Sequence, residues 1–363
     1  MGDSAAGGAR HLAALAREPR PAGGEAEQRA RRYAEELLEG AGFTVRREPF
    51  SYSTFPGRYA TPIGGAIAGA TVLVAAALGL TQPSRYGPLA ALAVGLLVLG
   101  AFARSMAGDG VLALPLLRAD GVNVSATRAS ATPRVWLVAH LDSKSQPVPS
   151  LLRVVGVMLL GSAIMLAIAA AVLQLASLPS RIIWWVAVLD ALVGAGPVVA
   201  SVVGARSPGA LDNASGVAAV LGAAERLDGD SAVGILLTSA EELGLAGARA
   251  WASVHAPAVA LNCDGVDDEG EVTIMHGSNP PTDVIDAVRR SSTRDVRVRR
   301  MPLGLLTDSV ALADREWRAV TVSRGSLASL RRVHTPDDSL DALRGTGVDE
   351  VATVLARAAE ALA

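Results

Sequence analysis

Two adjacent glutamates, Glu241 and Glu242, are the residues of this chain best suited to chemistry. They end an apolar, strand-like run that begins at Gly234. Neighbouring carboxylates repel each other, so keeping both ionised is costly unless a cation compensates them. One of the pair could bind a metal ion while the other handles a proton. Such a site needs further ligands, which should stand at the ends of other strands.

The segment after Arg134 is a second apolar run that ends in reactive side chains. It ends in His140, whose neutral imidazole can bind a metal, and Asp142 follows two residues later. A carboxylate at that spacing could accept the other ring N–H and fix the histidine tautomer. Three more candidate ligands stand beside predicted strands or a helix start: Asp212, Asp264 and His334.

These residue types favour a centre with two metals. Mixed sets of histidine and carboxylate suit Zn²⁺, Mn²⁺ or Co²⁺ in open, catalytic sites. Five ligands are too many for one catalytic zinc, whereas they fit two metals about 3.5–4 Å apart that share one carboxylate. The only cysteine, Cys263, is expected to be a small core residue rather than a nucleophile. We therefore expect two Zn²⁺ ions, with Mn²⁺ or Co²⁺ as alternatives.

The elements that must position these side chains alternate along the chain. The apolar pattern predicts strands at 44–52, 233–239, 258–262, 272–275 and 319–323, and helices at 217–227, 245–254, 284–291 and 349–362. Strands separated by helices indicate a mostly parallel sheet that is covered on both faces. Open α/β sheets place their sites at the carboxyl ends of the strands, which is where the candidate ligands stand.

The order of the motifs resembles a known family, the co-catalytic zinc aminopeptidases of metallopeptidase family twenty-eight (clan MH). The motifs are His-x-Asp from 140, Asp-Asn-x-Ser-Gly from 212, Glu-Glu from 241, Asn-x-Asp from 262 and His-Thr-Pro-x-Asp from 334. The segment from His11 to Arg20, with the helix to Leu38, is similar to the opening of that family. The resemblance implies a zinc-exopeptidase-like, three-layer α/β/α fold with a mostly parallel mixed sheet.

The resemblance also implies a role for each site residue. Of the five metal ligands, Asp212 bridges both ions, and each ion has two ligands of its own: His140 with Asp264, and Glu242 with His334. Glu241 is then the general base, which takes a proton from the metal-bridging water as hydroxide forms and passes it to the leaving amine. Asp142 orients His140.

The function expected from this set is a zinc-dependent exopeptidase, an aminopeptidase that removes N-terminal residues from peptides. A carboxypeptidase, an amidohydrolase or a glutaminyl cyclase would keep the fold and change the reaction. An inactive, peptidase-like scaffold would be marked by degraded ligands, and the set here is complete. The formal net charge of −2 gives no reason to expect a nucleic-acid partner.

Four apolar segments interrupt the peptidase pattern, at 63–80, 87–103, 154–176 and 182–203. Each has about 17–23 residues, the length that a bilayer requires. Tyr86 and the pair Trp184-Trp185 stand where membrane interfaces favour aromatic residues. We expect two transmembrane hairpins, with four helices, rather than buried core helices. Asp190 lies inside the last segment, either as a functional residue or as a hydrogen-bond partner of a neighbouring helix.

The hairpins divide the predicted catalytic domain into 1–59, 104–150 and 204–363, with hairpins at 60–103 and 151–203. The even number of helices puts all catalytic parts on one side of the membrane. Four arginines flank the helices on that side and two stand at the hairpin tips: Arg58, Arg104, Arg153 and Arg206, against Arg85 and Arg181. The positive-inside rule then favours a multi-pass protein of the cell membrane with a cytoplasmic catalytic domain.

The second hairpin lies between His140 and Asp212 in the sequence, although both are predicted ligands of the same metal pair. Because an extended chain covers at most about 3.3–3.6 Å per residue, the short connections predict an active site within about 30–35 Å of the bilayer. A membrane-associated peptide is therefore the expected substrate, and the lipid bilayer the expected partner. Two pairs beside the site stay open: Thr307-Asp308 as pocket residues or an N-cap, and Asp337-Asp338 as supports of the turn after His334 or as residues that hold a metal ligand in place.

Overall fold

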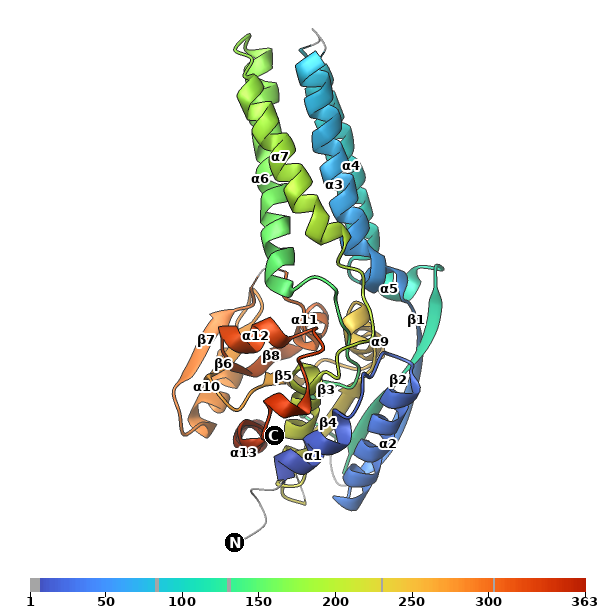
Figure 1. Cartoon of the computed structure of the whole chain (residues 1–363). Coiled ribbons are helices and arrows are strands. Elements are labelled where there is room, and N and C mark those ends of the chain that lie inside the picture. Colours follow the sequence, from blue (N-terminus) through green and yellow to red (C-terminus); the bar gives the residue numbers. More distant parts are fainter. Residues whose placement is uncertain (1–6, 82–84, 129–131, 230, 303) are drawn as a thin grey trace. The chain divides into compact units, whose positions relative to one another are not determined.

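The computed structural model describes residues 7–81, 85–128, 132–229, 231–302 and 304–363. The chain forms two compact units (Figure 1). The α/β unit comprises the chain up to Thr54 together with 112–145 and 205–363, and the helical unit comprises 55–111 and 146–204. The assignment of the inserted segments to membrane hairpins stays a prediction.

One mixed sheet forms the centre of the α/β unit. Its strands are β1 Thr44–Ser53, β2 Arg118–Thr127, β3 Val135–His140, β4 Val233–Thr238, β5 Val259–Val266, β6 Glu271–His276, β7 Val296–Arg300 and β8 Arg318–Gly325. Their order is β1-β2-β4-β3-β5-β8-β6-β7. The central run β4-β3-β5-β8 is parallel, while β1, β2 and β6 pair antiparallel with neighbours. The predicted mixed, mostly parallel α/β sheet is therefore confirmed.

The sequence pattern missed strands β2 and β7, and β7 lies at an edge of the sheet. This edge strand reads Val-Arg-Val-Arg-Arg, and four of its five residues are exposed. Edge strands are often charged, which discourages pairing with other chains, so the apolar signal that marks a buried strand is weak here.

Helices cover both faces of the sheet because side chains alternate along each strand. Leu137 on β3 packs into a core shared with α1 Gly7–Leu15, α2 Glu25–Gly40, α8 Ser215–Ala224, α10 Thr282–Ser291 and α13 Thr346–Leu362. Trp136 and Val138 point the other way, toward α9 Ala246–Val254 and α11 Asp308–Ala313. The three-layer α/β/α arrangement follows, and Cys263 is buried in the first of these cores, as expected.

The parallel strands bring the candidate site residues to one edge of the sheet, at the carboxyl ends of the strands. Residues in register on β3, β4 and β5 run in the same direction, so their carboxyl ends lie together. His140 is the last residue of β3, Glu241 follows the end of β4 by three residues, and Asp264 lies near the end of β5. The remaining short elements of this unit are α12 Leu327–Arg332 and three single turns at Ala210–Ala214, Glu241–Leu243 and Leu340–Ala342.

The helical unit contains four long helices: α3 Phe55–Thr81, α4 Gly87–Met106, α6 Ser150–Leu175 and α7 Arg181–Val199. Each is long and apolar enough to cross a membrane. A short helix, α5 Gly110–Ala113, follows α4. Small residues let the long helices approach: a Cβ atom on Gly65 would lie 2.5 Å from Val198 Cγ1, and one on Gly69 would lie 3.3 Å from Ala195 Cβ.

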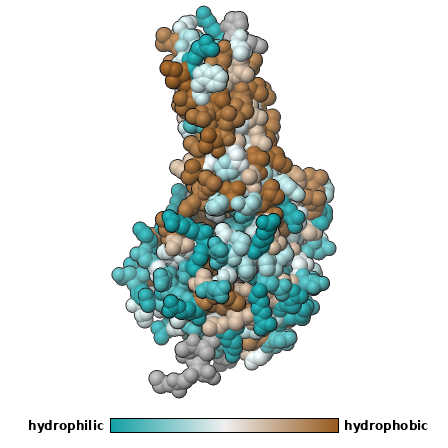
Figure 2. Space-filling model, viewed as in Figure 1, coloured by the Kyte–Doolittle hydropathy of each residue, from teal (hydrophilic) through white to brown (hydrophobic). Residues whose placement is uncertain are grey.

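Large apolar side chains cover the outer surface of this unit. On the face that Figure 2 shows, most of the surface of the long helices is hydrophobic, whereas the α/β unit is mostly hydrophilic. Leu97 is 73% exposed and Ile182 is 75% exposed. Within the unit, Ser162 on α6 donates a hydrogen bond to Asp190 Oδ2 on α7 at 2.8 Å. The carboxyl group of Asp190 therefore bonds to a neighbouring helix, one of the two interpretations that its sequence position allowed.

Candidate active site

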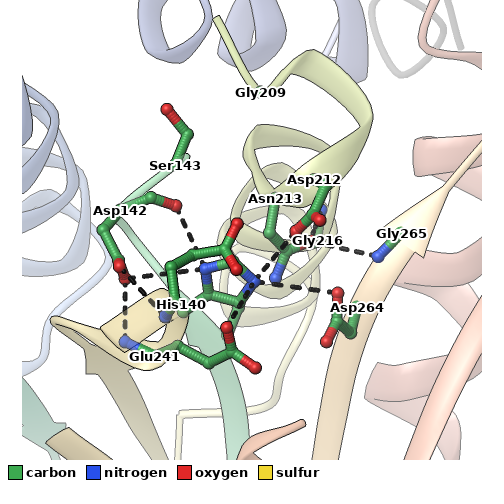
Figure 3. A network of polar contacts seen from close by, with 12 residues as sticks. His140, Asp142, Ser143, Gly209, Asp212, Asn213, Gly216, Glu241, Asp264 and Gly265 are labelled. Carbon is green, nitrogen blue, oxygen red and sulfur yellow. Dashed lines mark hydrogen bonds and ion pairs between the residues drawn. The ribbon is translucent and has the colours of Figure 1, made fainter. Parts of the chain in front are cut away.

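His140 is oriented at the end of β3 by its own chain. Its Nδ1 lies 3.1 Å from the backbone carbonyl oxygen of Asp142 and 3.6 Å from Oδ1 of the same residue. The other ring nitrogen, Nε2, consequently faces carboxylates. It lies 3.2 Å from Asp212 Oδ1 and 3.7 Å from Asp264 Oδ1, as Figure 3 shows. The imidazole is buried.

Asp142 connects the histidine to the turn that carries both glutamates. Its carboxylate accepts hydrogen bonds from the backbone N–H groups of Glu241 and Glu242 at 3.1 and 3.2 Å. The turn begins after Ala240, which has a φ of 58°. From it the two side chains diverge: Glu241 Oε2 lies 3.9 Å from His140 Nε2, and Glu242 Oε1 lies 3.3 Å from His334 Nε2.

Asp212 sits in a turn that only glycine can begin. Gly209 has a φ of 62°, and a Cβ atom there would lie 2.5 Å from Ser143 Cβ. Asp338 fixes the turn from the other side, because its carboxylate accepts the backbone N–H groups of Leu211 at 2.5 Å and Asp212 at 3.1 Å. Asp338 therefore supports the Asp212 turn, and the peptide bond after Asp212 is cis.

Asn213 joins this turn to β5. Its Nδ2 donates to the carbonyl oxygen of Cys263 at 2.9 Å, and its Oδ1 accepts from the backbone N–H groups of Gly216 and Gly265. Ser215 adds a second connection, since its hydroxyl accepts from the backbone N–H of Val266 at 2.8 Å. These bonds hold Asp212 and Asp264 at a set separation.

Asp212 stands between two groups of ligand-type side chains. Its Oδ1 lies 3.2 Å from His140 Nε2, and its Oδ2 lies 3.0 Å from His334 Nε2. One group is His140, Glu241 and Asp264, and the other is Asp212, Glu242 and His334; within each, the ligand atoms lie within 4.8 Å of one another. The structure thus brings together all seven residues that the sequence singled out, from positions up to 194 residues apart in the chain.

Burial and the two histidines dominate the electrostatics of the acidic groups. Burial raises the pKa of Glu241 well above its usual range, and the charges of Glu242 and Asp264 add to this effect while His140 opposes it. Burial alone would also raise the pKa of Asp212, but hydrogen bonds from His140 and His334 outweigh burial and hold its pKa well below the usual range.

A comparison with protein families identifies the family of this chain. The model of Peptidase family M28 matches residues 123–359, which is more than half of the chain. The chain belongs to Peptidase family M28. The matched range contains every candidate site residue, and the membership expected from the order of the motifs is confirmed.

Solved structures similar to this M28 protein support the same fold. An aminopeptidase from Aneurinibacillus sp. strain AM-1 is 16% identical, with 98% of this chain and 92% of that chain covered and a TM-score of 0.54. A zinc aminopeptidase from Bacillus subtilis is 13% identical over 98% of this chain and 94% of its own, with a TM-score of 0.55. A glutaminyl cyclase from Porphyromonas gingivalis is 14% identical over 98% and 96%, with a TM-score of 0.54. No curated protein matches the chain.

The residues of the site fit a metal centre of the kind expected. Three buried atoms of the candidate ligands have no hydrogen-bond partner within the described part of the chain: His140 Nε2, Glu242 Oε1 and His334 Nδ1. Nitrogen and oxygen atoms that are buried without partners are costly, and metal coordination is one way to satisfy them. The first two of these atoms face the carboxylates and imidazoles of the two groups, where an ion would lie.

Two cations near the site had no role in the sequence analysis. Lys144 Nζ lies 2.6 Å from Glu242 Oε2. Arg20 is 2% exposed, and its guanidinium donates to the carbonyl oxygens of four residues: Leu15, Leu141, Pro208 and Gly209. It thereby ties the segment after His140 to the segment before Asp212. The only sequence signals were that Lys144 is the sole lysine and that Arg20 lies in the family-like opening.

The open pair Thr307-Asp308 also lies at the site. Thr307 occupies the position before α11, but its hydroxyl lies near those of Ser309 and Thr321 and does not cap the helix. Asp308 accepts a hydrogen bond from the Thr238 hydroxyl at 2.5 Å, and burial raises its pKa to about 7. Thr307 is therefore the N-cap residue of α11 by position, but its side chain makes no capping hydrogen bond.

Proposed function

We propose that this M28 protein is a membrane-anchored, zinc-dependent aminopeptidase that removes N-terminal residues from peptides. The observation that carries the proposal is the position of Asp212, whose two carboxylate oxygens contact histidines of different groups. A carboxylate placed in this way is suited to hold two metal ions at once.

The donor set supports zinc. His140 and Asp264 would hold one ion together with Asp212, and Glu242 and His334 would hold the other. Imidazole and carboxylate are the ligands that catalytic zinc commonly takes, and the Bacillus subtilis enzyme with the same fold is a zinc aminopeptidase. When bound, a zinc pair polarises a carbonyl group and lowers the pKa of water to about 7.

Glu241 is the side chain proposed to move protons. Its carboxylate is buried at the site, and the Asp142 carboxylate fixes its backbone. A carboxylate in this place can take a proton as the peptide bond is attacked and return it to the leaving amine, a role that typically contributes 10²–10⁴-fold in rate. Asp142 contributes by holding both His140 and the glutamate turn in place.

The helical unit supports membrane anchoring. Four helices of sufficient length and apolar composition expose large side chains such as Leu97 and Ile182, which water solvates poorly. We propose that they cross the cell membrane as two hairpins, with the catalytic parts in the cytoplasm and peptides near the bilayer as substrates.

A labelling experiment tests this topology. Ser180 lies just before α7, at the proposed tip of the second hairpin, and Cys263 is buried, so the unmodified protein is a matched control. In intact cells, Ser180→Cys should react with a membrane-impermeant maleimide, whereas Arg206→Cys should react only after the cells are opened. The reverse pattern would contradict a cytoplasmic catalytic domain.

The activity is tested with detergent-purified full-length protein and a panel of aminoacyl fluorophores. We expect release of the fluorophore that a chelator abolishes and zinc restores, with about two zinc ions per chain. Activity that a chelator leaves unchanged would refute the metallopeptidase proposal.

A second candidate function is that of a glutaminyl cyclase, because the chain is similar in structure to the enzyme from Porphyromonas gingivalis. The two reactions differ in their products. Peptides with N-terminal glutamine would lose only ammonia in cyclisation, while an aminopeptidase releases a free amino acid. Mass spectrometry of such peptides after incubation separates the two.

A further inference from the structure

The only lysine of this chain stands beside one group of candidate ligands. Lys144 lies four residues after His140, in the segment that leaves β3, and its Nζ is 2.6 Å from Glu242 Oε2. Its side chain is 17% exposed, and that of Glu242 is 4% exposed. A lysine ammonium in such surroundings is a fixed positive charge inside the site.

This ion pair divides the Glu242 carboxylate between two partners. Oε2 is paired with Lys144, while Oε1 lies 3.3 Å from His334 Nε2 and has no hydrogen-bond partner among the described residues. One oxygen of Glu242 is therefore left for a metal ion, and its negative charge is already partly neutralised.

The two groups consequently differ in charge. Because Asp212 would serve both ions, the first group of ligands is His140, Asp264 and Asp212, which carries two carboxylates, and no Lys or Arg ion pair is found for either within the described residues. Asp212, Glu242 and His334 also carry two carboxylates, but Lys144 adds a positive charge. With neutral imidazoles, the sums are −2 for the first group and −2 + 1 = −1 for the second.

We propose that Lys144 makes the group of Asp212, Glu242 and His334 the weaker of two zinc sites, so that zinc loads first beside His140 and Asp264. This inference rests on the proposed function, because it presupposes that both groups bind zinc. Lys144 acts as a positioning residue that stabilises the Glu242 carboxylate in the metal-free protein and competes with the second ion for it.

Lys144 has two opposing effects on the zinc affinity of the second group, and their relative sizes decide whether that affinity rises or falls. A residue that orients a metal ligand typically improves affinity by about 10–100-fold. A cation that shares a carboxylate with a divalent ion repels that ion, and in a buried site of low dielectric such repulsion is large. Because Lys144 contacts the same carboxylate group that would bind the ion, we expect repulsion to outweigh orientation.

Zinc titration of the metal-free, full-length protein in detergent tests the proposal. Calorimetry with a competing chelator should show one tight and one weaker zinc ion in the unmodified protein. Lys144→Met should tighten the weaker ion by about tenfold or more and leave the tighter ion unchanged. Lys144→Arg, the matched control that keeps the charge, should preserve the difference. An unchanged or weakened second ion in Lys144→Met would overturn the inference.

Thermal unfolding distinguishes an effect of Lys144 on zinc binding from a role in the stability of the fold alone. Removing Lys144 takes away the partner of Glu242 Oε2, so metal-free Lys144→Met should melt below the unmodified protein. Zinc should then raise its Tm by more than it raises that of the unmodified protein. A lower Tm with an unchanged zinc-induced shift would mean that Lys144 only supports the fold, and would overturn the proposal.

Ligand variants identify which group fills first. His334→Ala should retain the tight ion, and His140→Ala should lose it. The reverse result, or two equal ions in the unmodified protein, would refute the loading order and leave the proposed function standing. No bound zinc in the unmodified protein would refute the proposed function itself.

Discussion

The α/β unit and the helical unit place their polar groups in opposite ways. In the α/β unit, buried acids, imidazoles and the Arg20 guanidinium converge at the carboxyl ends of β3, β4 and β5. In the helical unit, small residues pack the interior, and one described hydrogen bond between side chains, from Ser162 to Asp190, joins two helices. Its outer surface is apolar (Figure 2).

The difference teaches what each unit requires of its surroundings. A site of converging charges needs a backbone held by many hydrogen bonds, because each unsatisfied buried group is costly. A bundle with an apolar exterior needs an apolar solvent, since its helices satisfy their own backbone groups. Substitutions that act on one unit should therefore leave the other unchanged.

The largest effect is expected at the centre of the α/β unit. Glu241→Gln keeps the size of the side chain but removes its ability to take a proton, so turnover should fall by about 10²–10⁴-fold while zinc content stays the same. Rate and metal content are measured on the same preparation, with the exposed Glu269→Gln as control. Substantial turnover in Glu241→Gln would remove that residue from the role of proton acceptor.

The second-largest effect is expected for Arg20→Met, which should lower the free energy of unfolding. The substitution leaves four carbonyl oxygens without their buried donor, and each buried group that is left unsatisfied costs about 1–3 kcal/mol. Chemical unfolding of the α/β unit measures the change, and Arg17→Met on the exposed surface is the matched control. If both variants unfold alike, Arg20 does not hold the two ligand segments together.

In the helical unit, two neighbouring glycines allow a paired test. A Cβ atom on Gly65 would lie 2.5 Å from Val198 Cγ1, whereas one on Gly64 would lie 4.0 Å from Leu99 Cδ1. Gly65→Ala should destabilise the packing of α3 by about 1–3 kcal/mol through overpacking. Gly64→Ala should stabilise the helix by about 0.5–1 kcal/mol.

Thermal unfolding in detergent shows whether each glycine variant is more or less stable than the unmodified protein. Zinc binding should be unchanged in both, because the substitutions lie outside the α/β unit. Equal shifts for the two variants would show that α3 does not pack closely at Gly65.

The smallest effect concerns pH and lies away from the site. Burial alone would raise the pKa of Asp268, but hydrogen bonds from the backbone of Gly347 and Arg344 and from the Thr346 hydroxyl outweigh it and lower the pKa. A carboxyl group with a lowered pKa stabilises the fold above its unfolded pKa, and this contribution is lost as the pH falls through the folded value.

Asp268→Asn should therefore lower the free energy of unfolding by about 1 kcal/mol at neutral pH. The difference from the unmodified protein should shrink as the pH falls below 3.8, the unfolded value. Urea unfolding across this range measures it, with the exposed Asp341→Asn as control. A difference that does not depend on pH would exclude the charge of Asp268 as its cause.

Much of the candidate site could be predicted because its ligands follow apolar strands. His140 ends β3 and Asp264 lies in β5, and continuous apolar runs mark those strands in the sequence. The order of the motifs also predicted the family, whose model matches residues 123–359. The long helices were equally visible, because apolar runs of such length are rare in other structures.

The supporting residues could not be predicted in the same way. Lys144 and Arg20 lie in loops without periodicity, and their partners are far away in the chain: Glu242 for Lys144, and Pro208 and Gly209 for Arg20. Strand β7 was missed because its side chains are mostly charged and exposed, so burial left no pattern in its sequence.

The amino-acid sequence by itself determined which side chains are available for chemistry, which segments form strands and long helices, and to which family the chain belongs. These properties depend on residue type and on spacing along the chain. Only the tertiary structure decided that Asp212 stands between two histidines, that Asp142 holds the glutamate turn, and that one group of ligands has a lysine beside it. Such contacts join segments up to about two hundred residues apart, and only the folded chain brings them within hydrogen-bond distance.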